Sequence, residues 1–232
     1  MGKITIYHGS ENIIKNPDMK AGRKHNDYGQ GFYCTEDLEL AKEWACKNDK
    51  DGFANRYILD LTDLKVLNLN SDGYTILNWI AVLLRNRIFS LDGSVSNAAR
   101  KYIIEHYSVN IENYDVVIGY RADASYFSFA EAFVSNSLPL RSLNKALRLG
   151  KLGGQVALVS EKAFEQLEFV EALLADRGMY YPKFYSRDIN ARKRYRNEIA
   201  HAQDILDDIF VVDIIRQEMK NDDPRIQRIV SK

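Results

Sequence analysis

The chain has 232 residues, of which 46% are hydrophobic and 28% are charged, a composition typical of globular proteins. Its 32 Lys and Arg balance its 32 Asp and Glu, so no overall field attracts nucleic acid, membrane or acidic substrates. No apolar run reaches the roughly 20 residues that cross a bilayer, and the first residues turn polar too soon for a secretory signal. We therefore expect a cytoplasmic protein without a membrane partner.

The first predicted element is a strand over residues 3–8, which alternates and is rich in β-formers. A polar loop follows, then a short strand over 32–35 and a helix capped by Thr35. Leu38, Ala41, Trp44 and Ala45 share one face of that helix. The Asp51-Gly52 pair ends it, and two extended segments follow over 55–61 and 65–69.

The middle of the chain alternates between helical and strand-like patterns. The predicted elements are helices over 74–87, 94–106, 125–134 and 140–149 and strands over 114–120 and 155–160. From Glu161 onward the pattern predicts mainly helix, with an apolar helical stripe between Ile205 and Ile215. Early strands, central helices and a helical tail together predict an α+β fold.

The cysteines and histidines predict no metal site. Cys34 and Cys46 have neither a metal-ligand spacing nor a disulfide framework. His25, His106 and His201 likewise have no ligand spacing with cysteines or carboxylates. We expect reduced thiols and a protein that binds no metal.

The most informative segment runs from Asp27 to Thr35 and contains Gly29, Gly31 and Tyr33. Its glycines permit close backbone approaches that a side chain would block. An earlier strand ends in His8-Gly9, so an imidazole, an aromatic face and bare backbone amides can meet at strand ends. Such groups suit a flat heterocycle that bears an amide, and nicotinamide is one.

Three segments resemble the His–Tyr–Glu arrangement of ADP-ribosyltransferases in the diphtheria-toxin and poly-ADP-ribose-polymerase branch. They are Tyr7-His8-Gly9-Ser10, Gly31-Phe32-Tyr33-Cys34-Thr35 and the strand that begins at Gln155. The chain most resembles an uncharacterised bacterial family with an Asp-Phe-Gly-x-Gly-Phe-Tyr-x-Thr segment, in which Tyr28 replaces the first Phe. The resemblance implies an ADP-ribosyltransferase-like split, bent β-core with surrounding helices over residues 1–165. It leaves a helical C-terminal extension over 166–232, which we expect to pack on that core.

The resemblance also implies roles for individual residues. His8 would hold a ribose hydroxyl of NAD, the Gly9 backbone would pair with the nicotinamide carboxamide, and Tyr33 would stack on the nicotinamide ring. Gly31 belongs to the same NAD-binding turn. Gln155 stands where the family has its catalytic glutamate, so His8, Tyr33 and Gln155 form a His–Tyr–Gln variant. The preceding loop, 149–154, would help to select the acceptor.

Gln155 changes the chemistry that the motif can supply. Breaking the ribose–nicotinamide bond develops positive charge on the sugar, which a carboxylate stabilises. Gln155 offers only neutral hydrogen bonds, which are roughly half as strong as charge-assisted ones. Asp123 or Glu131 could supply the missing charge.

The implied activity is transfer of ADP-ribose from NAD to a macromolecular acceptor, with release of nicotinamide. The alternatives are a non-catalytic module that binds NAD or another nucleotide, and an NAD glycohydrolase. The family implies a bacterial toxin or phage-conflict effector, with a small neutralising protein as a partner. The basic run 187–196 is interpreted as a solvated helix face, with docking of nucleic acid or an acidic partner as the alternative.

Overall fold

The structure is a computed structural model that describes residues 2–121, 124–149, 154–201 and 208–230. The chain forms two compact units, and each draws on three stretches of sequence. The sheet unit comprises residues 1–68, 110–121 and 152–188, and the helical unit comprises 69–109, 122–151 and 189–232.

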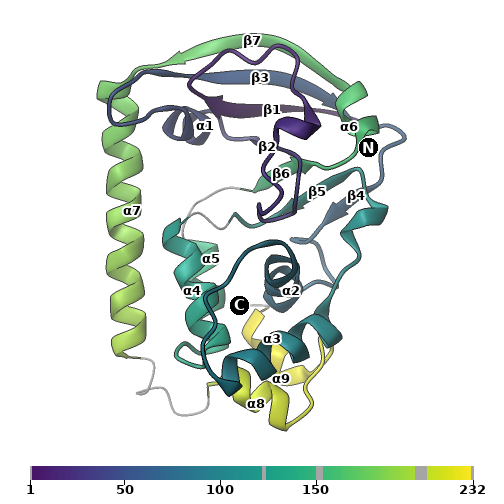
Figure 1. The fold of residues 1–232 in the computed structure, drawn as a ribbon, viewed down its shortest axis with the longest axis vertical. Coiled ribbons are helices and arrows are strands. Elements are labelled where there is room, and N and C mark those ends of the chain that lie inside the picture. The colour runs from purple at the N-terminus through teal and green to yellow at the C-terminus, as the bar shows by residue number, and fades with distance from the viewer. Residues whose placement is uncertain (1, 122–123, 150–153, 202–207, 231–232) are drawn as a thin grey trace. The chain divides into compact units, whose positions relative to one another are not determined.

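The sheet unit contains one seven-stranded sheet with the order β4-β5-β6-β2-β1-β3-β7 (Figure 1). Its strands are β1 Lys3–Ser10, β2 Phe32–Thr35, β3 Gly52–Asp60, β4 Val66–Asn68, β5 Val116–Gly119, β6 Gln155–Leu158 and β7 Leu167–Ala175. Neighbouring strands are antiparallel except β4 and β5, which are parallel. The predicted α+β class is confirmed.

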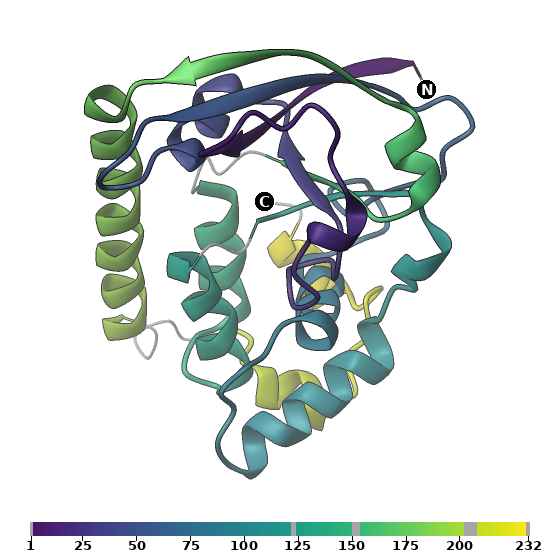
Figure 2. The same ribbon diagram turned by 45° about the horizontal axis from the view of Figure 1, so that its top comes forward.

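A narrow junction joins the two halves of this sheet. β1 pairs with β3 along its whole length, from Lys3 to Ser10, whereas β1 and β2 share only the pair Tyr7–Thr35. Figure 2 shows β1, β3 and β7 crossing the top of the sheet unit, with β2 and β6 turning away below them. The residues around Tyr7 and Thr35 therefore lie where the sheet changes direction.

Side-chain alternation explains how β2 is anchored. Phe32 and Cys34 point into the core with Ile6 and Tyr57, while Tyr33 lies between them on the opposite side of the strand. Helix α6, Glu161–Glu165, begins at Ser160, whose hydroxyl accepts from the Ala163 amide, and it covers this core with Ala163 and Phe164.

Helix α1, Leu38–Ala45, packs on β1 and β3 through two glycines. A Cβ atom on Gly9 would lie 2.2 Å from the Ala41 carbonyl oxygen, and one on Gly52 would lie 2.2 Å from that of Ala45. The absent side chains allow this close approach. The helix is capped by Asp37 and not by Thr35, the cap predicted two residues earlier. The Asp37 carboxylate accepts from the Leu40 amide, and the Thr35 hydroxyl accepts from the Asp37 amide.

The helical unit is built around α2, Ile76–Asn86, whose residues 76–84 are all buried. Its other helices are α3 Ser94–Tyr107, α4 Ala124–Val134, α5 Leu140–Leu149, α8 Val211–Arg216 and α9 Pro224–Val230. Helix α7, Arg177–Ala200, contributes residues up to 188 to the sheet unit and the remainder to the helical unit. Short 3-10 turns occur at Met19–Ala21 and Ile111–Asn113. Within the described ranges, no helix has the length and apolar character needed to span a membrane.

The end of the chain has the predicted helical character but also contains a strand that was not predicted. The segment after Glu161 is mainly helical, in α6, α7, α8 and α9, while β7 lies between α6 and α7 and pairs with β3 at one edge of the sheet. Its Leu, Glu and Ala residues favour helix locally, and pairing with β3 overrides that preference. The stripe predicted over 205–215 is helical only within α8, and residues 202–207 lie outside the described part.

The division of the chain also differs from the predicted boundary between 165 and 166. β7 and the part of α7 up to residue 188 belong to the sheet unit, so the segment 166–232 is divided between the two units. The helical unit instead takes residues from before, between and after the strands β5 and β6. Such interleaving leaves no composition shift at a single boundary, which is why the sequence did not reveal it.

Candidate functional site

The junction between β1 and β2 fixes the imidazole of His8. Its Nδ1 lies 2.7 Å from the Tyr33 carbonyl oxygen, and its ring stacks on Phe32 with the centroids 4.3 Å apart. A carbonyl can only accept, so Nδ1 carries the hydrogen and the neutral ring presents Nε2 as an acceptor. Burial lowers the pKa of His8, and the bond to the Tyr33 carbonyl opposes that shift in part. The imidazole is therefore held neutral and oriented.

The phenol of Tyr33 closes the glycine turn that precedes it. Its hydroxyl donates to the Gly29 carbonyl at 2.6 Å and accepts from the Tyr28 amide at 3.1 Å. Gly29 has a φ of 81°, a conformation that favours glycine. The Tyr33 ring lies parallel to that of Tyr28, which in turn donates to the Tyr120 carbonyl at 2.6 Å.

The structure brings His8 and Tyr33 together through a ring nitrogen and a backbone carbonyl. Their rings pack on different neighbours, Phe32 for His8 and Tyr28 for Tyr33. On β2, Phe32 and Tyr33 alternate between the two faces of the strand. A ligand held between the two rings therefore stays a prediction.

Gln155 begins β6 at the same junction. It pairs with Thr35 on β2 and with Gly119 on β5, and Thr35 in turn pairs with Tyr7, the residue before His8. Gln155 is 6% exposed, and its buried Oε1 has no hydrogen-bond partner among the described residues. An unsatisfied buried acceptor costs about 1–3 kcal/mol. An oxygen of this kind is positioned to accept from a ligand or water.

The two glycines proposed to bind NAD have different surroundings. Gly9 lines a cavity of about 350 Å³ whose wall includes Ser10, Trp44 and Ala45. A Cβ atom on Gly31 would lie 2.4 Å from the carbonyl oxygen of Leu158, so this glycine lets the turn pack on β6. Both glycines thus allow close packing of the fold, and Gly9 also borders the cavity.

Trp44 is a candidate site residue that sequence reasoning assigned only to the apolar face of its helix. Trp44 lines the same cavity as Gly9, and the Arg121 guanidinium covers its ring at 3.6 Å from the centroid. Helical spacing already placed Trp44 on one side with Ala41 and Ala45. Only the packing of α1 on β1 shows that this side meets Gly9. Glu11 and Lys47, which form an ion pair, also line this cavity.

The structure describes one of the two carboxylates that could supply the charge that Gln155 lacks. Asp123 lies outside the described residues, as do residues 150–153 of the predicted acceptor loop. Glu131 belongs to α4 of the helical unit, where its carboxylate accepts from the Ser90 amide at 3.5 Å.

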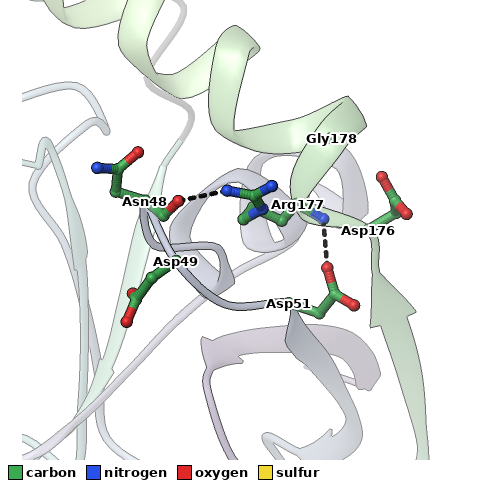
Figure 3. Close-up of a pocket in the computed structure, with 6 residues that line it drawn as sticks. All are labelled: Asn48, Asp49, Asp51, Asp176, Arg177 and Gly178. Atoms are coloured by element: carbon green, nitrogen blue, oxygen red, sulfur yellow. Dashed lines mark hydrogen bonds between the residues drawn. The ribbon is translucent and has the colours of Figure 1, made fainter.

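A second, more open pocket of about 770 Å³ lies at the start of α7 (Figure 3). It is lined by Asn48, Asp49, Asp51, Asp176, Arg177 and Gly178. The Arg177 amide donates to the Asp51 carboxylate at 2.7 Å, and its guanidinium donates to the Asn48 carbonyl at 2.6 Å. These bonds fasten the loop before β3 to the beginning of the helix.

Comparisons with curated proteins and with solved structures gave no match. One family profile matches residues 4–169, a span that includes His8, Tyr33 and Gln155. The match covers well over half of the chain. The chain therefore belongs to the family described as "Protein of unknown function (DUF3990)".

Proposed function

We propose that this protein transfers ADP-ribose from NAD to a macromolecular acceptor and releases nicotinamide. The observation that carries the proposal is the buried Oε1 of Gln155, which has no partner among the described residues. A ribose hydroxyl of NAD would donate the missing hydrogen bond. The single residue pair between β1 and β2 supports the further proposal that the sheet is the split, bent core of ADP-ribosyltransferases.

The neighbouring groups support binding of NAD. The neutral His8 ring offers Nε2 as a second acceptor for a ribose hydroxyl. Gly9 and Trp44 line one cavity, which would bring a backbone group and an aromatic residue to a nicotinamide ring. Tyr33 is a further aromatic candidate, on the turn that its own hydroxyl closes.

The proposed reaction breaks the bond between C1′ of the ribose and the nicotinamide nitrogen. The electron pair leaves with nicotinamide, and a nucleophilic atom of the acceptor bonds to C1′ and loses a proton. Positive charge develops on the sugar, and Gln155 stabilises it only through a neutral hydrogen bond. We therefore expect slow turnover from the natural chain.

Gln155→Glu tests this reasoning directly. A carboxylate at this position would stabilise the developing charge, so we expect label transfer from NAD to rise about 10- to 100-fold. Gln155→Ala, the matched control, should lower turnover more than NAD affinity. If calorimetry detects no NAD binding to either the natural chain or the Glu variant, the proposal is wrong.

The neutrality of Gln155 also favours a second candidate, a non-catalytic module that binds NAD or another nucleotide. A third is an NAD glycohydrolase, in which water replaces the acceptor. Products separate the three: label on a macromolecule supports transfer, free ADP-ribose supports hydrolysis, and saturable binding without either supports the module. A bacterial toxin or phage-conflict effector in the cytoplasm, with a small neutralising partner, is the setting in which we place the transferase.

A further inference from the structure

Charged side chains of both signs meet at the cavity that Gly9 lines. Of the described residues around this cavity, Glu11 and Lys47 are the charged ones. Lys47 forms an ion pair with one carboxylate oxygen of Glu11, and the Lys50 ammonium lies 3.8 Å from the other. The Lys47 amide donates to the Lys50 carbonyl at 3.3 Å, which joins the two lysines across a short turn. We call Glu11, Lys47 and Lys50 the charged cluster.

The carboxylate of the charged cluster is fixed in position and ionised. The buried side-chain amide of Asn55 donates to the carbonyls of His8 and Asn12, at 3.2 and 3.1 Å, so it fastens the chain on both sides of Glu11. The hydrogen bond from Lys47 lowers the pKa of the Glu11 carboxyl. The Glu11 side chain is 26% exposed, whereas the Lys47 side chain is 67% exposed. The negative charge is therefore the more enclosed part of the cluster.

The charges of NAD match those of the cluster. In oxidised NAD the nicotinamide ring carries a positive charge, and the diphosphate carries negative charges. The proposed function brings this ring to Gly9 and Trp44, which line the same cavity as Glu11. A carboxylate there attracts the positive ring, and ammonium groups attract phosphate oxygens. One ligand that carries both charges can satisfy the carboxylate and the lysines together.

We propose that the charged cluster selects the oxidised form of NAD, with Glu11 beside the positive nicotinamide ring and Lys47 and Lys50 on the diphosphate. This inference rests on the proposed function and assigns three further binding residues to it. Reduced NAD has a neutral ring, so it gains nothing from Glu11 and binds more weakly. ADP-ribose lacks the ring altogether and meets only the two lysines.

Glu11 contributes to the proposed reaction in a different way from Gln155. The positive charge is present on the ring before the bond breaks, and it passes to the sugar as nicotinamide leaves. Attraction to Glu11 therefore stabilises bound NAD as well as the transition state, which raises affinity more than turnover. Loss of Glu11 should accordingly raise KM more than it lowers kcat, whereas loss of Gln155 should do the opposite.

Calorimetric titration of the full chain with oxidised NAD, reduced NAD and ADP-ribose tests this assignment. We expect the natural chain to bind oxidised NAD about three- to tenfold more tightly than reduced NAD. Glu11→Gln should remove that difference by weakening the binding of oxidised NAD alone. Lys47→Gln/Lys50→Gln should keep the difference and weaken the binding of all three ligands at least about threefold. The matched control, Glu168→Gln, removes an exposed carboxylate of β7 and should bind like the natural chain.

Equal binding of the two forms of NAD by the natural chain would overturn this inference and leave the proposed transferase intact. A Glu11→Gln protein that keeps the preference, or a Glu168→Gln protein that loses it, would have the same consequence. So would a lysine variant that binds ADP-ribose as tightly as the natural chain. If oxidised NAD does not bind at all, both proposals fail. Circular dichroism establishes that each variant is folded.

Discussion

The contact between Gly52 and helix α1 offers a sharp test of how the sheet unit is built. Replacing Gly52 by Ala would place a Cβ atom 2.2 Å from the Ala45 carbonyl oxygen and 2.7 Å from the Ala45 Cβ. The φ of Gly52 lies outside the left-handed region, so alanine can adopt the local backbone. The expected effect is therefore steric.

The magnitude follows from the overlap. An ordinary contact begins near 3.4 Å, so the end of α1 must move by about 1 Å. Overpacking of this kind costs about 1–3 kcal/mol, and the reduced freedom of the unfolded alanine chain returns about 0.4–1 kcal/mol. We expect a net loss of about 1–2 kcal/mol and a Tm lowered by roughly 2–8 °C.

Urea and thermal unfolding followed by circular dichroism would measure this loss. Gly2→Ala is the matched control, because a Cβ atom there meets nothing within 4 Å. Its free energy of unfolding should stay within about 0.5 kcal/mol of the natural chain. A Gly52→Ala protein that is equally stable would refute the packing of α1 on β3 as described.

Two further predictions concern buried charge in the sheet unit. Arg187 donates to both carboxylate oxygens of Glu43, at 2.9 and 2.8 Å, and the Glu43 side chain is nearly buried. Arg187→Met leaves the Glu43 carboxylate without this partner, so the free energy of unfolding in urea should fall by about 3 kcal/mol. The double variant Arg187→Met/Glu43→Met should recover most of that loss. Equal stability of the single and the double variant would contradict this prediction. Because the folded pKa of His8 is lowered, the unfolded chain binds a proton more readily below about pH 6.5, and stability should fall as the pH drops through that region. Urea midpoints of His8→Asn should depend less on pH there, and an unchanged pH dependence would exclude His8 as the cause.

Much of the candidate site could be predicted because its signals are local. The strand over 32–35 has the predicted bounds, since Phe32 and Cys34 alternate with Tyr33 and a glycine turn precedes them. Gln155 likewise begins its strand as predicted, whereas β1 continues two residues beyond His8, to Ser10. What these residues bind remains a proposal.

Tertiary packing determined the features that the sequence did not predict. β7 became a strand because β3 offers an edge with which it can pair, although its own residues favour helix. Trp44 meets Gly9 because α1 approaches two glycines that are more than forty residues apart in sequence. The sequence by itself determined where apolar and polar residues alternate, where turns occur and which face of a helix is apolar, because these features depend on near neighbours. Partners across the sheet and the burial of the Gln155 oxygen depend on residues far along the chain, so only the folded structure could reveal them.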